Sequence, residues 1–196
     1  MPIRPLEPIC HPLDLFASSP VLADDRRWWV FQVRPRAEKV FGQLFSRSGA
    51  SYFLPMYVRK WRSKGRSFQS QLPLFPGYVF VTGDVEGAAR STAFATNFII
   101  REVPAPDQQL LARQLAGVHA VLSGGADPRP ETGMVSGQPV VVVDGPYAGV
   151  EGRFMNADGE LRVVVEISLL GQGVSVAVER WMVRPAEHSL VPSRSR

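Results

Sequence analysis

Three valine-rich runs separated by glycine-containing turns occupy the last third of the chain, and they restrict its fold more than any other feature. The runs are QPVVVVDG, LRVVVEISLLG and VSVAVERWMV, between residues 138 and 183. β-branched residues favour strands, and short strands at regular spacing with turn residues between them are typical of small barrels. The sequence therefore predicts a small all-β barrel of about 50 residues over 134–185.

The preceding part of the chain alternates between strand and helix patterns. WWVFQVR (28–34) is aromatic and β-branched, as expected of a buried strand, and residues 36–48 place apolar side chains at helical spacing. The further expectations are strands at 51–61, 78–81 and 99–103, a basic loop or hairpin tip around Gly65, and helices at 84–95 and 107–122. This order predicts a layered α+β domain over residues 26–122.

Three segments lack a periodic apolar pattern and are predicted to lie outside the two domains. Residues 1–25 hold five prolines and are interpreted as a flexible leader. Residues 123–133 (SGGADPRPETG) contain three glycines and two prolines and are interpreted as a linker. Residues 186–196 form a short tail.

Positive charge is concentrated in one segment. Residues 26–66 carry eleven lysines and arginines against a single acid, Glu38, whereas the whole chain has a net charge of only +4. A basic part joined to an acidic remainder favours contact between the first domain and a polyanion such as nucleic acid. The alternative is a solvated face whose charges serve solubility.

Several classes of protein are disfavoured by what the sequence lacks. There is one cysteine, Cys10, and the three histidines are far apart, so no metal-ligand spacing occurs. No phosphate-binding glycine loop and no paired-carboxylate cluster stands out. No apolar run approaches the 18 or so residues of a membrane span. We therefore expect a cytoplasmic, non-enzymatic protein with no catalytic residues, metal site, cofactor or membrane contact.

The segment GQPVVVVDGPYAGVEGRFM (137–155) has the make-up of a KOW motif. Gly145 and Pro146 form a tight turn after the alternating valines, Tyr147 packs, and Gly149 and Gly152 allow the backbone to bend or approach a neighbour closely. A generic β-hairpin with conveniently placed glycines is the alternative interpretation.

Three further segments carry a resemblance to a known family. WWVFQV, the LP of SYFLPMYV, and LFPGYVFV occur in the order and spacing of the N-terminal domain of the NusG family, and a KOW segment follows after a linker. The resemblance covers residues 26–185 and implies an antiparallel-sheet α/β sandwich followed by an SH3-like KOW barrel. LPM before the hairpin, PLFP after it and the D-G-E-x-R turn are most similar to the specialised RfaH-like branch.

The resemblance implies that the protein binds RNA polymerase. In this family an apolar depression receives the clamp helices of the largest subunit, and a second element touches the opposite side of the cleft. The second element corresponds to Ala89–Thr92, of which Ser91 and Thr92 are the candidate contacts. The depression corresponds to Trp29, Gln32, Phe75, Pro76, Tyr78 and Phe80.

Strand alternation separately places Tyr78 and Phe80 on one face and Val79 and Val81 on the other. One apolar face can pack on helices, and the other is either free to bind a partner or covered within the domain.

The resemblance also implies contacts beyond the clamp helices. Arg34, Arg36 and Lys39 correspond to the region that meets the non-template DNA strand, and Trp61 is a candidate for stacking on a base or for covering its own strand. Leu169 and Leu170 correspond to the position that contacts a small-subunit ribosomal protein or the Rho factor. We expect a resident β-barrel here, because its valine runs and Gly171 and Gly173 disfavour helix.

Together these features predict a monomeric transcription elongation and antitermination factor that suppresses pausing or termination at a limited set of operons. A KOW-containing RNA-binding protein of the translation apparatus is the alternative. That alternative predicts a basic KOW domain, whereas residues 134–184 carry four basic and six acidic residues, which favours a protein partner.

Overall fold

The computed structural model describes residues 8–17, 26–84, 87–125, 127–133, 137–157 and 159–186. The chain divides into two compact units, Met1–Arg113 and Gln114–Arg196, and the division falls inside helix α3 (Gln108–Ser123). Within the described residues, no helix is both long enough and apolar enough to cross a membrane.

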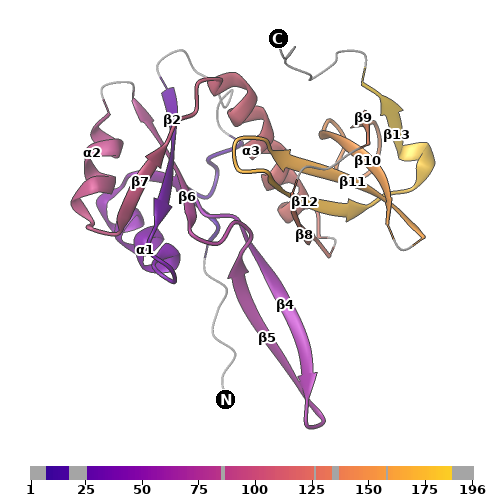
Figure 1. Ribbon diagram of the computed structural model, residues 1–196, viewed down its shortest axis with the longest axis horizontal. Helices are drawn as coiled ribbons and strands as arrows, with labels where there is room; N and C mark the ends of the chain where they lie inside the picture. The colour runs from indigo at the N-terminus through magenta and orange to yellow at the C-terminus, as the bar shows by residue number, and fades with distance from the viewer. Residues whose placement is uncertain are drawn as a thin grey trace. The chain divides into compact units, whose positions relative to one another are not determined.

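A five-stranded antiparallel sheet is the centre of the first unit (Figure 1). Its long central strands are β2 (Arg26–Val33) and β6 (Tyr78–Asp84), which pair from Arg26 opposite Asp84 to Gln32 opposite Tyr78. The sheet order is β1-β3-β6-β2-β7, with β1 at Cys10–His11, β3 at Ser51–Phe53 and β7 at Ile99–Val103.

Two helices cover one face of this sheet. Helix α1 (Glu38–Ser48) contributes Phe41 and Phe45, and helix α2 (Ala88–Ala95) contributes Ala89 and Ala93, to a core that includes alternate residues of both central strands. Burial of such side chains is the main stabilising contribution. Gly49 ends α1 in the left-handed conformation, where glycine carries no Cβ penalty.

Aromatic side chains cover part of the opposite face. Phe80 is 0% exposed, and its ring lies 5.8 Å from that of Phe75 and 6.3 Å from that of Phe53. Phe16 in turn packs edge-on against Phe53, with 4.9 Å between ring centroids. Of the two alternatives that the sequence left open, the face carrying Phe80 is therefore covered within the unit at this position.

A two-stranded hairpin extends away from the sheet (Figure 1). It consists of β4 (Met56–Ser63) and β5 (Arg66–Pro73), joined by Lys64 and Gly65, both with positive φ. Such a two-residue turn matches the twist of antiparallel strands. The single strand expected over 51–61 is two strands in the structure, because β3 ends before Pro55, which cannot donate a ladder hydrogen bond.

The second unit contains a six-stranded antiparallel sheet where the sequence predicts a barrel. The order is β13-β9-β10-β11-β12-β8. The strands are β8 (Arg129–Thr132), β9 (Gln138–Val142), β10 (Glu151–Ala157), β11 (Glu160–Ile167), β12 (Gln172–Ala177) and β13 (Val183–Pro185), with a 3-10 turn, η1, at Arg180–Met182.

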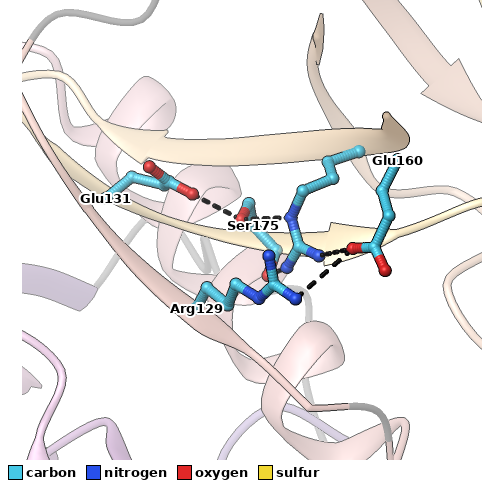
Figure 2. Close-up of polar contacts among 5 residues, drawn as sticks. Arg129, Glu131, Glu160 and Ser175 are labelled. Atoms are coloured by element: carbon cyan, nitrogen blue, oxygen red, sulfur yellow. Dashed lines mark hydrogen bonds and ion pairs between the residues drawn. The ribbon is translucent and has the colours of Figure 1, made fainter. Parts of the chain in front are cut away.

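A buried arginine connects three strands of this sheet (Figure 2). Arg162 of β11 is 2% exposed, and its guanidinium donates to Ser175 Oγ at 2.9 Å, to the Ser175 carbonyl at 3.0 Å and to Glu160 Oε2 at 3.0 Å. Ser175 Oγ in turn donates to Glu131 Oε1 of β8 at 2.6 Å, and Arg129 Nη2 lies 3.4 Å from Glu160 Oε2. The network satisfies a charge that would be costly to bury alone.

Ordered structure extends into two segments that the sequence places outside the domains. Cys10 and His11, in the expected leader, pair with β3. β8 lies in the expected linker and pairs with β12, from Gln172 opposite Thr132 to Ser175 opposite Arg129. The domain limits drawn from the sequence remain a proposal, and residues 1–7, 18–25 and 187–196 lie outside the described residues.

Candidate functional site

A groove of about 660 Å³ lies in the first unit where β2 passes into α1. One wall is the β2–α1 junction, a second is the base of the hairpin, and the third is the turn before β6. The lining residues are Gln32, Val33, Pro35, Arg36, Glu38, Lys39, Tyr57, Ser70, Gln71, Leu72, Pro73, Pro76, Gly77 and Ile100. The groove thus brings together residues that the sequence predicted for polymerase binding and for DNA binding.

A buried carboxylate holds the turn that forms one wall. Glu38 is 5% exposed, and its Oε1 accepts a hydrogen bond from the Gly77 N–H at 2.7 Å. The Gly77 carbonyl accepts from the Val33 N–H at 2.8 Å, so the turn is tied to both β2 and α1. Gly77 has a φ of +80°, which a side chain would strain. Sequence reasoning counted Glu38 only as the lone acid of the basic segment.

Basic side chains follow the β2–α1 junction. Arg34 and Arg36 are exposed and Lys39 is half-buried, and among the residues that the structure describes none of the three forms an ion pair. Arg36 has a φ of +66°, which is uncommon for a residue with a side chain. Arg101 of β7 places a fourth cation beside the groove residue Gln32, since its Nε donates a hydrogen bond to Gln32 Oε1 at 2.7 Å. The rim is therefore positively charged.

The structure separates the predicted clamp-helix contacts into two groups. Trp29, Phe75 and Phe80 are buried, so in this conformation they support the surface rather than form it. Pro76 is exposed, and Gln32 and Tyr78 are half-buried. The register of β2 and β6 places Gln32 opposite Tyr78, so these two residues are cross-strand neighbours beside Pro76.

The predicted second contact element lies on α2. Ser91 is exposed, whereas the Thr92 hydroxyl donates to the Ala88 carbonyl of its own helix at 3.0 Å. Arg90 precedes them and carries an ion pair with Glu102 at 2.6 Å. Of the two candidates, Ser91 is the one whose side chain is exposed to a partner.

Trp61 has an aromatic partner that the sequence analysis did not name. Trp61 and Phe68 are directly opposite each other in the hairpin, and their rings stack with centroids 5.7 Å apart and an angle of 17° between planes. Each side chain is 43% exposed. The Lys64–Gly65 turn is the signal that could have found Phe68, because a two-residue turn fixes the register of both strands.

In the second unit, most of the residues predicted to form a KOW motif lie in the turn between β9 and β10, and Gly152 lies within β10. Tyr147 is buried, whereas Gly145, Pro146 and Gly149 are exposed in the turn. At Gly152 a Cβ atom would lie 2.5 Å from the Val164 carbonyl oxygen, so the neighbouring strand can approach only a glycine there.

The loop between β11 and β12 is fixed to α3. A contact role requires Leu169 and Leu170 to be accessible, and both are half-buried. The Gln114 side chain donates to Ser168 Oγ at 2.6 Å and accepts from the Ser168 N–H at 3.1 Å. These two hydrogen bonds hold the residue before the leucines in place.

The ionisable groups with shifted pKa values lie outside the groove. Burial raises the pKa of the Cys10 thiol, and the nearby Asp14 carboxylate raises it further. Burial lowers the pKa of His119 in α3. Within the described ranges, no group of three or more histidine, cysteine and acidic side chains could hold a metal ion.

One family model matches the chain. It is the model described as NusG, transcription termination factor nusG, and it matches residues 26–130, which is more than half of the chain. No curated protein matches.

Solved structures also resemble the chain. The one titled "Domain interaction in Thermotoga maritima NusG" is 19% identical with a TM-score of 0.42, and the match covers 84% of this chain and 99% of that one. The one titled "Crystal Structure of MjSpt4:Spt5 complex conformation A" is 13% identical with a TM-score of 0.26, covering 81% and 97% respectively.

Proposed function

The chain belongs to the NusG family of transcription factors, and we propose that it binds transcribing RNA polymerase and suppresses pausing or termination at a limited set of operons. It acts by binding, without catalysing a reaction, since a factor that prefers one polymerase conformation shifts the enzyme toward that conformation. Its specialisation within the family is of the RfaH-like kind.

The observation that carries the proposal is the groove at the β2–α1 junction. It combines the exposed Pro76, in the turn before β6, with Gln32, Arg36 and Lys39 at the β2–α1 junction. An uncharged surface beside a basic rim suits a factor that grips a protein next to its bound nucleic acid. Tyr78, opposite Gln32, extends the uncharged part.

We assign the partners to separate parts of the site. The clamp helices of the largest subunit contact Gln32, Pro76 and Tyr78, and Ser91 contacts the opposite side of the cleft. The exposed non-template DNA strand follows Arg34, Arg36 and Lys39. In the second unit, Leu169 and Leu170 contact a small-subunit ribosomal protein or the Rho factor.

Retention on immobilised core RNA polymerase tests the proposal. The wild-type chain should be retained, and Gln32→Ala combined with Tyr78→Ala should weaken retention about 10-fold or more, since interface aromatics commonly contribute about 2 kcal/mol. Val143→Ala is the matched control, because Val143 is an exposed apolar residue of the second unit. Retention on ribosomes but not on polymerase would contradict the proposal and support the translation alternative.

A further inference from the structure

The β4–β5 hairpin carries cations and aromatic rings with no acidic residue. Residues 56–73 contain five lysines and arginines and no aspartate or glutamate. Residues 59–69 are all exposed, and the hairpin forms a two-stranded sheet of its own (Figure 1). An isolated hairpin of this kind gains little from burial, so its composition points to a ligand of opposite charge.

The strand register sorts these side chains onto two different faces. Trp61 is opposite Phe68, and the flanking pairs are Arg59 with Ser70 and Ser63 with Arg66. Because side chains alternate along a strand, Arg59, Trp61, Phe68 and Arg66 share one face. The other face carries Lys60 opposite Gln69 and Arg62 opposite Ser67, with cations but no aromatic ring.

We propose that the face formed by Arg59, Trp61, Phe68 and Arg66 binds single-stranded nucleic acid, by stacking unpaired bases on the two rings and contacting phosphates with the two arginines. Every base has a π-face, so ring stacking favours unpaired bases of any sequence. In a duplex the bases already stack on one another and are not available. Arginine adds a planar cation that contacts phosphate through two N–H groups.

The stacked rings are arranged for this role. Their 5.7 Å centroid separation and 17° interplanar angle leave the two planes nearly parallel, and 43% of each side chain is exposed. Two rings that served only to stabilise the hairpin would do so by burying apolar area between them. These rings leave much of that area exposed to solvent, where a base can stack on it.

The same face continues toward the groove. Tyr57 and Ser70 lie nearer the base of the hairpin on the Trp61 face, and both line the groove that contains Arg36 and Lys39. A strand held on the rings can therefore reach the basic rim. For its biological setting the inference rests on the proposed function, since a transcribing complex exposes unpaired nucleic acid.

The test measures binding of the full chain to fluorescent oligonucleotides without polymerase. The probes are a roughly 12-nucleotide oligothymidine, an abasic strand of equal length and charge, the corresponding oligouridine, and a duplex. We expect the oligothymidine to bind about 5- to 100-fold more tightly than the abasic strand, and more tightly than the duplex. Equal affinity for the oligothymidine and the abasic strand would overturn the proposal.

Two pairs of variants identify the face. Trp61→Leu with Phe68→Leu keeps an apolar cross-strand pair but removes both rings, so it should abolish the preference for bases over abasic sites and leave the salt dependence unchanged. Arg59→Gln with Arg66→Gln should lower the log–log salt slope by about 0.7 for each lost phosphate contact. Lys60→Gln with Arg62→Gln removes the same charge from the other face and should lower the slope less.

The outcomes separate this inference from the proposed function. A leucine variant that keeps the full preference for bases overturns the inference, even if the chain still binds polymerase. If the wild-type chain is not retained on immobilised RNA polymerase, the proposed function is overturned, even if the hairpin binds oligothymidine. Comparison of oligothymidine with oligouridine shows whether DNA or RNA is the better ligand.

Discussion

We expect the stability of the first unit to depend on the Glu38 carboxylate, which holds one wall of the groove through its hydrogen bond with Gly77. Glu38→Ala removes the acceptor of the Gly77 N–H, which lies 2.7 Å away in a part-buried position. A hydrogen bond to a charged group contributes about 1.5–3 kcal/mol, and loss of a negative charge at the start of a helix costs about 0.3–1 kcal/mol more. We therefore expect the free energy of unfolding to fall by about 2–4 kcal/mol.

Glu38→Gln is the matched control. Its amide oxygen can still accept from Gly77, so only the charge and its interaction with the N-terminus of α1 are lost, and the free energy should fall by about 1 kcal/mol. Urea unfolding followed by tryptophan fluorescence measures both, in a Trp181→Phe background that restricts the signal to the three tryptophans of the first unit. Equal losses for the alanine and glutamine variants would refute the reasoning, because the acceptor would then contribute nothing.

Three further predictions concern charge. Arg162→Leu should destabilise the second unit by about 1–3 kcal/mol in chemical unfolding, because it leaves the buried Ser175 hydroxyl and carbonyl oxygens without their donor. Replacing Arg34, Arg36 and Lys39 with Gln should weaken binding to an elongation complex. The slope of log binding constant against log salt concentration should fall by about 0.7–0.9 per lost phosphate contact. Binding to polymerase without nucleic acid should change little. Burial lowers the pKa of His119, so the unfolded chain takes up a proton first as the pH falls, and stability should decrease below a pH of about 6.5. His119→Gln should remove that decrease in pH-dependent unfolding.

The local elements were predictable because their signals are local. Aromatic and β-branched runs identify β2 and β6, and the helical spacing of Phe41 and Phe45 with Gly49 beyond them identifies α1. The Lys64–Gly65 turn identifies the hairpin and, through its register, the pairing of Trp61 with Phe68.

Long-range packing could not be predicted from the sequence. Alternation correctly separates Phe80 from Val79, but it cannot reveal that Phe75 and Phe53 cover the Phe80 side. The role of Glu38 depends on a contact 39 residues away along the chain. β8 forms within a segment rich in glycine and proline, because β12 offers it backbone partners and Glu131 accepts from Ser175.

Site-specific photo-cross-linking tests the central claim most directly. A photoreactive amino acid is placed at Pro76, in the groove, and at Val143 as an exposed control in the second unit. After irradiation of the protein with a transcribing polymerase complex, position 76 should give an adduct with the largest subunit, and position 143 should not. Absence of an adduct from position 76, or equal adducts from both positions, would contradict the assignment of the groove as the polymerase-binding surface.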